Sequence, residues 1–181
     1  MTEDEKNKER RKSLEKEMVC KRSFIDSWDA HHGPVKYHVD GRLAIAVPND
    51  AREAIINGHQ VKDRLTLVYR GGGVTLLEKV LRVQEAGASA VIIVDEEDGC
   101  DENFYCGPFL GQRPADRLSL GFAHQDLASS WRSVRIPAIL IRREDALKLT
   151  RWENLGTITL PEGKGEHRII WQPSERARRR R

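Results

Sequence analysis

A strand, three glycines and a helix follow one another near the middle of the chain, and a second strand comes directly after them. Residues 65–70, LTLVYR, are largely apolar and predict the first strand. A helix is predicted from about Thr75 to Ala86, because Thr75 and Glu78 match a capping box ahead of a one-sided apolar pattern. SAVIIV (89–94) is almost continuously apolar, as a parallel strand between two layers is. The stretch therefore predicts one right-handed β-α-β unit.

Four more apolar segments predict strands: RLAIAV (42–47), PAILIR (137–142), LGTITL (155–160) and EHRIIW (166–171). The last two are joined by PEGKG and predict a hairpin. Residues 48–58 predict a short helix that Asn49 or Asp50 begins and Asn57-Gly58 ends, and residues 143–150 predict another. The predicted fold class is α/β in the broad sense (α+β), with one parallel unit beside antiparallel strands.

The charge of the chain is uneven along its 181 residues, a length that fits one domain with extensions. Arg176 and Arg178 to Arg181 supply five positive charges, and without them the net charge falls from +3 to −2. The sequence predicts a charged helical arm over residues 1–27, a domain over 28–173 and a disordered Arg-rich tail over 174–181. Because burying unpaired charge is costly, both ends are expected to be attachment segments that a partner neutralises.

Membrane and secretory classes are disfavoured by the same composition. No apolar run approaches the roughly 20 residues that cross a bilayer, and the charged N-terminus has no signal-peptide core. The three cysteines, Cys20, Cys100 and Cys106, are too few for a disulfide framework and fit a reducing compartment. A cytoplasmic protein is therefore expected.

The glycines at 71–73 raise the question of a phosphate site. A P-loop needs Lys and Ser or Thr directly after its last glycine, and Val74-Thr75 stand there instead. A dinucleotide fingerprint has Gly71 and Gly73 in place and Asp95 as a candidate ribose ligand, but Leu76 occupies the third glycine position. The sequence favours a structural turn formed by Arg70, Gly71, Gly72 and Gly73, with at least one glycine at positive φ.

Other chemistry-bearing residues do not form a recognisable motif. Metal sites need converging ligands at short spacing, and Cys100 and Cys106 are further apart than the usual two to four intervening residues. No G-x-S-x-G pattern accompanies the serines, so a hydrolase triad is not predicted. No catalytic residue, metal or cofactor is expected. The residues considered are His31, His32, His38, Cys100, Cys106, His124, Asp126, Ser129 and Ser130.

Five segments in order resemble the protease-associated (PA) domain family. They are Val68-Tyr69-Arg70-Gly71, Glu78-Lys79-Val80, Ala86 to Val94, Ile136 to Ile141, and Asp145 to Leu149. The resemblance covers roughly residues 41–150 and implies an open β-barrel or sandwich with short flanking helices. Many members carry a cysteine after Arg-Gly, where Val74 stands here, and its partner about where Arg52 lies, so no disulfide is expected at this place.

The resemblance also implies a function without chemistry. PA domains bind or shield polypeptides, usually beside a protease, a membrane span or a ubiquitin-ligase domain, and the sequence shows none of these companions. A stand-alone, non-catalytic module is expected, with a protein partner or a larger assembly. The alternatives are a nucleotide-dependent or hydrolytic enzyme fragment, and a basic-tail adaptor for nucleic acid or another polyanion. The candidate binding residues are Phe104, Tyr105 and Phe109 in the irregular 95–130 stretch, and Arg178, Arg179, Arg180 and Arg181.

Overall fold

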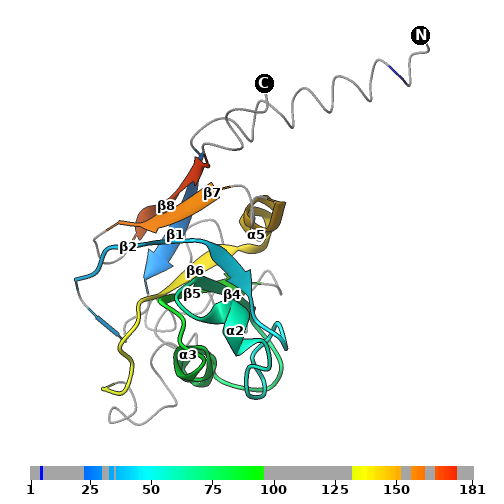
Figure 1. Ribbon diagram of the computed structural model, residues 1–181, viewed down its shortest axis with the longest axis vertical. Helices are drawn as coiled ribbons and strands as arrows, with labels where there is room; N and C mark the ends of the chain where they lie inside the picture. Colours follow the sequence, from blue (N-terminus) through cyan, green and yellow to red (C-terminus); the bar gives the residue numbers. More distant parts are fainter. Residues whose placement is uncertain are drawn as a thin grey trace, which may run out of the picture.

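A computed structural model describes Glu5 and residues 23–29, 33–34, 36–95, 132–151, 156–161 and 166–174. In this part of the chain, eight strands form one sheet in the order β2-β7-β8-β1-β6-β5-β4-β3 (Figure 1). The strands are β1 (Ser23–Asp29), β2 (Val39–Gly41), β3 (Leu43–Ile45), β4 (Leu65–Tyr69), β5 (Ala90–Asp95), β6 (Ala138–Arg142), β7 (Gly156–Leu160) and β8 (Glu166–Pro173). The helices are α2 (Gly58–Val61), α3 (Leu76–Glu85) and α5 (Arg143–Arg151).

The sheet curls until its two edges are joined by a single stretch of chain. β2 and β3 stand at opposite ends of the strand order, yet only Arg42 separates them in the sequence. β2 pairs with β7, from Val39 opposite Leu160 to Gly41 opposite Ile158, and β3 pairs with β4 in parallel. The predicted open-barrel architecture is therefore confirmed.

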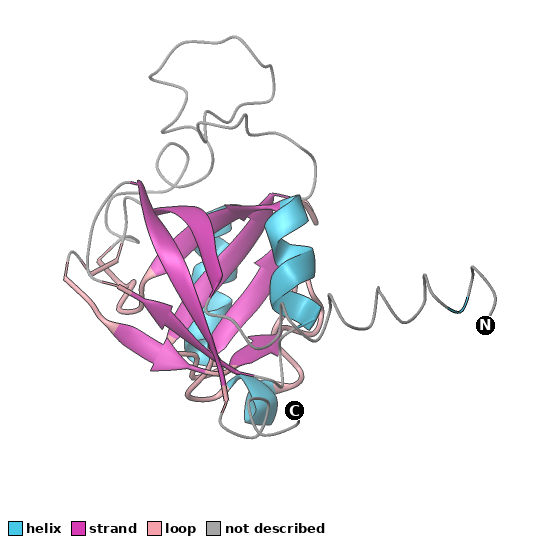
Figure 2. Ribbon diagram, turned by 90° about the horizontal axis from the view of Figure 1, so that it is seen from above, coloured by secondary structure: helices cyan, strands magenta, loops and turns pink. Residues whose placement is uncertain are grey.

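Two apolar clusters lie on the two faces of this curved sheet, as the alternation of β5 shows. Ala90, Ile92 and Val94 point to an inner cluster that also contains Ile25 and Trp171. The intervening residues of β5 point to an outer cluster, which α2 and α3 cover from outside the sheet (Figure 2). Because both faces of β5 are covered, its run of apolar residues is fully buried.

The β-α-β prediction is confirmed in detail. β4, α3 and β5 follow the predicted limits closely, and β4 and β5 pair in parallel from Leu65 opposite Ala90. Thr75 is the N-cap of α3: its Oγ1 accepts a hydrogen bond from the Glu78 amide at 3.2 Å, and Glu78 Oε2 accepts from the Thr75 amide at 2.9 Å. The predicted β7–β8 hairpin is antiparallel, also as expected.

Two local predictions differ from the structure. β1 was not predicted, and its pairing with β8 over Ser23 to Trp28 means that the boundary drawn between residues 27 and 28 falls inside a strand. The predicted helix over 48–58 is wrong, because Ala51 has φ of 48° and Asn57 begins α2 instead of ending a helix. Residues 1–22 of the predicted arm over 1–27 lie outside the described residues, apart from Glu5, and so do the stretch 96–131 and residues 175–181.

Candidate functional site

The glycine turn is a structural element held by an ion pair. Gly71, Gly72 and Gly73 have φ of 96°, 73° and 71°, which confirms the prediction of positive φ. Arg70 closes the turn: its Nη1 donates to Asp95 Oδ1 at 2.9 Å, and its amide donates to the Val94 carbonyl at 2.9 Å. Three successive left-handed residues let the chain reverse from β4 into α3, a conformation that side chains with a Cβ disfavour.

The geometry of this turn does not fit a dinucleotide. Asp95, the candidate ribose ligand, has a side chain only 3% exposed and is paired with Arg70. Leu76 is buried where a third glycine would allow close contact between helix and strand. The carboxylate of Glu78 occupies the start of α3, where an anionic phosphate would otherwise be favoured.

Gly72 and Gly73 offer a matched test of the turn. A Cβ on Gly72 would lie 2.6 Å from Asp50 Oδ2 and 3.1 Å from Arg52 Cβ, whereas a Cβ on Gly73 would meet nothing within 4 Å. Gly73→Ala should lower the free energy of unfolding by about 1–2 kcal/mol, the cost of the left-handed conformation alone. Gly72→Ala should cost more because it adds a steric clash. Urea denaturation measures both, and equal losses would contradict this packing.

Residues 46–57 form a loop after β3 that long-range hydrogen bonds fix in place; we call it the anchored loop. Lys79 Nζ donates to the Asp50 carbonyl, and Arg82 Nη1 donates to the Ala51 carbonyl at 2.9 Å, so two cations one turn apart on α3 hold neighbouring peptide groups. The Tyr69 amide adds a bond to the Asn49 carbonyl at 2.8 Å.

Lys79 holds the anchored loop from a fully buried position. Burial lowers the pKa of the Lys79 ammonium, and the nearby charge of Asp50 opposes that shift. Since a buried cation is costly unless it is paired and hydrogen-bonded, the contact with the Asp50 carbonyl is a requirement of the fold. Lys79 therefore stabilises this loop.

Asn57 completes the anchored loop by covering the open side of β3. Its Nδ2 donates to the Ile45 carbonyl at 2.8 Å, and its Oδ1 accepts from the Val47 amide at 2.9 Å. These are the two kinds of bond that a neighbouring strand would make. The Ile56 amide extends the pairing to the Val47 carbonyl at 2.9 Å. The side chain thus occupies an edge that would otherwise present unpaired backbone groups.

The anchored loop carries two of the large apolar side chains that the described residues expose. Val47 is 43% exposed and Ile56 is 77% exposed, and their backbones are hydrogen-bonded to each other. Neighbouring Ile55 packs against the outer core, so the loop divides its apolar side chains between the interior and the surface. Phe24 on β1 and Leu147 on α5 are the other two such side chains.

Comparison with known proteins places this fold. A family model described as the PA domain matches residues 32–149. The chain belongs to the PA domain family. The family resemblance predicted from the order of the five segments is therefore confirmed.

Solved structures similar to this PA domain include two aminopeptidases. The chain is 15% identical to BSAP, a zinc aminopeptidase from Bacillus subtilis, with a TM-score of 0.44, covering 94% of this chain and 38% of that chain. An aminopeptidase from Aneurinibacillus sp. strain AM-1 gives 15% identity, a TM-score of 0.41 and coverages of 94% and 41%. The PA domain thus spans less than half the length of either enzyme. No curated protein matches the chain.

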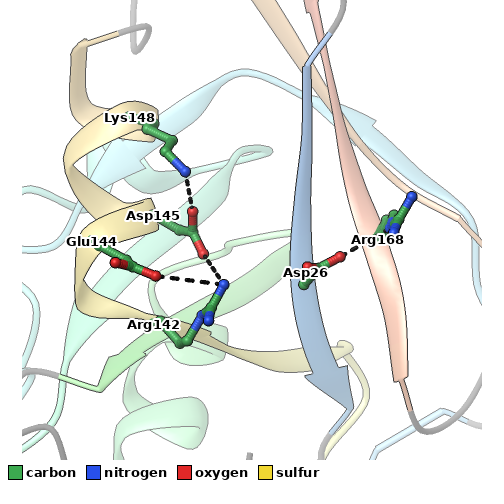
Figure 3. A network of polar contacts seen from close by, with 6 residues as sticks. All are labelled: Asp26, Arg142, Glu144, Asp145, Lys148 and Arg168. Carbon is green, nitrogen blue, oxygen red and sulfur yellow. Dashed lines mark hydrogen bonds and ion pairs between the residues drawn. The ribbon is translucent and has the colours of Figure 1, made fainter. Parts of the chain in front are cut away.

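A second polar group of the PA domain lies at the start of α5 (Figure 3). Asp145 is almost completely buried and stands between two cations, with Lys148 Nζ at 2.6 Å and Arg142 Nη2 at 3.6 Å. Arg142 also contacts Glu144 at 3.5 Å. Because Arg142 ends β6 and the other three belong to α5, these contacts fix the helix on the sheet. This group is structural, and α5 in turn buries Ala146 and Leu149 in the inner core.

Few of the residues singled out in the sequence come together in the PA domain. Of the histidine cluster, His38 is described, and its Nε2 lies 3.0 Å from Asp40 Oδ2 on the surface. Trp171 is a core residue. No group of three or more potential metal ligands occurs among the described residues, and no helix in this part of the chain could cross a membrane. The other candidates lie outside the described ranges. They are Phe104, Tyr105, Phe109, Arg178, Arg179, Arg180, Arg181, Cys100, Cys106, His124, Asp126, Ser129 and Ser130.

The exposed apolar side chains of the anchored loop were not predicted from the sequence. The sequence feature that could have indicated these exposed side chains is Ile55-Ile56, two adjacent branched residues in a polar segment. Both were assigned to a predicted helix, which hid the fact that only one of them is buried.

Proposed function

We propose that this PA domain is a non-catalytic module that binds a polypeptide, and that the anchored loop provides its main contacts. The observation that carries the proposal is the exposure of Val47 and Ile56 on a loop that α3 and Asn57 hold rigidly. Exposed apolar side chains that lie together on a protein surface are typical of interaction sites.

Rigidity matters because binding through a loop normally costs the entropy of ordering it. The carbonyls of Asn49, Asp50 and Ala51 are all bonded to residues of β4 or α3. The loop therefore presents Ile56 in a fixed position before any partner arrives, and little ordering entropy is lost on binding. Covering an exposed isoleucine contributes about 1.5–3 kcal/mol if its side chain becomes fully buried.

The proposal extends to location and companions. A low and odd cysteine count fits the cytoplasm, and a polypeptide partner or larger assembly supplies the activity that this module serves. Catalysis by the chain itself is not part of the proposed function.

The test is selection of peptides from a random display library on the full chain, followed by fluorescence anisotropy with a selected peptide. Ile56→Asp should weaken binding by more than tenfold, because it places a charge where an apolar side chain must be covered. Leu147→Asp is the matched control, since Leu147 is similarly exposed, at 61%, but lies on α5. Peptides that bind both variants as tightly as the native chain would refute the assignment of this loop.

A further inference from the structure

Asn57 and Gly58, where the anchored loop meets α2, form the one Asn-Gly pair among the 181 residues. An asparagine followed by glycine is prone to spontaneous deamidation, because the amide nitrogen of the next residue can attack the side-chain carbonyl carbon. Glycine has no Cβ, so it leaves this nitrogen unhindered and its own backbone free to rotate. The residue that covers the edge of β3 is therefore also a chemically reactive one.

The packing around Gly58 does not require a glycine. Within 4 Å, a Cβ at this position would meet only the Ala86 carbonyl oxygen, at an ordinary distance of 3.9 Å, and the residue has no positive φ. The Gly58 amide, at the first residue of α2, makes no hydrogen bond to any other described residue, as is usual in the first turn of a helix. The nitrogen that would attack is thus neither hindered nor occupied.

The native structure holds the Asn57 side chain away from this reaction. At ψ of 38°, the Gly58 nitrogen lies anti to the Asn57 Cβ about the Cα–C bond, whereas ring closure needs the two nearly eclipsed. The side-chain amide is also fixed, since Nδ2 donates to the Ile45 carbonyl at 2.8 Å and to Gln60 Oε1 at 3.0 Å, while Oδ1 accepts from the Val47 amide at 2.9 Å. Attack therefore needs a local opening that breaks these bonds and rotates the peptide.

We propose that Asn57 is a modification site, where spontaneous deamidation acts as a one-way switch that releases the anchored loop. When the loop opens, the Gly58 nitrogen loses its proton and bonds to Asn57 Cγ, which closes a succinimide ring and expels Nδ2 as ammonia. Water then adds to either ring carbonyl and gives aspartate or isoaspartate at this position. In the net reaction, an amide and water become a carboxylate and ammonium, and no electrons are exchanged.

The product cannot restore the bonds that held the loop. A carboxylate oxygen takes the place of Nδ2, so it faces the Ile45 carbonyl and has no hydrogen to donate. Isoaspartate also inserts an extra methylene into the backbone at the start of α2. Because an unpaired charge is costly at a site where Asn57 is only 8% exposed, the modified loop stays open. The switch does not depend on what the loop binds, so it is separate from the proposed function.

The experiment compares deamidation of the full chain with that of a synthetic peptide of residues 51–62, at mildly alkaline pH, by mass-spectrometric peptide mapping. The peptide lacks β3, so Asn57 should react more than tenfold faster in it than in the full chain, where three hydrogen bonds must first open. Gly58→Ala should slow the reaction of the full chain about tenfold, because its Cβ hinders the attacking nitrogen without disturbing the packing.

Gln60→Ala and Gln60→Glu are a matched pair that tests whether the native bonds protect Asn57. Gln60 is exposed and its Oε1 accepts from Asn57 Nδ2, so alanine should speed deamidation of the full chain about fivefold, the equivalent of one ordinary hydrogen bond. Glutamate keeps an acceptor oxygen at this place and should leave the slow rate unchanged.

The deamidated fraction of the native chain tests the consequence for the loop. Its added negative charge allows separation by ion exchange, and it should unfold at a lower urea concentration than the unmodified chain. The proposal fails if Asn57 reacts as fast in the full chain as in the peptide, or if Gly58→Ala reacts as fast as the native chain. It also fails if Gln60→Ala does not accelerate the reaction, or if the deamidated fraction resists urea as well as the unmodified chain.

Discussion

Gly156→Ala is expected to destabilise the fold by about 3 kcal/mol or more, the upper part of the range for overpacked cores. A Cβ at this position would lie 2.3 Å from the Gln172 carbonyl oxygen, 2.6 Å from Trp171 Nε1 and 2.7 Å from Trp171 Cε2. Neither the Gln172 carbonyl nor the Trp171 indole can shift easily to relieve this clash. Trp171 is a fully buried member of the inner core, and the backbone of β8 pairs with β1 on its other side. Since a domain is stable by only about 5–15 kcal/mol, this loss should be large.

Gly58→Ala is the matched control, with an effect of opposite sign. Gly58 begins α2, and a Cβ there would meet only the Ala86 carbonyl oxygen, at 3.9 Å, which is an ordinary contact. Alanine in a helix should stabilise by about 0.5–1 kcal/mol relative to glycine. Urea denaturation measures both variants. Trp171→Phe added to Gly156→Ala should recover part of the loss, because it removes the indole atoms of the clash, and no recovery would show that the ring is not its source.

Local physics explains the part of the PA fold that was predictable. The β-α-β unit follows from an apolar strand, a capping box and a one-sided helix, all of which act between residues a few positions apart. The glycine turn was predictable for the same reason, since Gly71 to Gly73 encode their own backbone freedom.

The anchored loop was not predictable, because contacts with distant residues determine it. Ala51 takes a positive φ that its own side chain disfavours, and Arg82, 31 residues later, binds its carbonyl. These contacts hold residues 48–58 in a loop in place of the predicted helix. β1 was missed for a different reason: its inward residues are Ile25 and Ser27 and its outward residues are Phe24 and Asp26, so each face mixes apolar and polar side chains. The start of β1 lies beside the end of β8 because these two strands pair, which no local pattern indicates.

Asn57→Ala is expected to lower the free energy of unfolding by about 2–4 kcal/mol, since each buried backbone group left without a partner costs about 1–3 kcal/mol. The substitution removes the bonds to the Ile45 carbonyl and the Val47 amide, and also a bond of 3.0 Å from Nδ2 to Gln60 Oε1. Asn57 is only 8% exposed, so water cannot readily replace these bonds. Thermal or urea denaturation of the variant measures the loss.

Asn57→Asp distinguishes the loss of these hydrogen bonds from a simple loss of volume. An aspartate matches the size of asparagine and still accepts from the Val47 amide, but its second oxygen would face the Ile45 carbonyl, where a donor is required. The variant should therefore be at least as unstable as Asn57→Ala near neutral pH. If aspartate were tolerated like asparagine, the amide would not be covering the edge of β3.

The Asn57→Ala substitution also links stability to the proposed function. Asn57 holds Val47, and the Ile56 amide is bonded to the Val47 carbonyl, so loosening this corner removes the fixed placement of the exposed pair. Selected peptides should bind Asn57→Ala more weakly than the native chain even at temperatures where the variant remains folded, because ordering the loop then opposes binding. If folded Asn57→Ala bound the selected peptides as tightly as the native chain, Asn57 would not be what fixes the exposed pair.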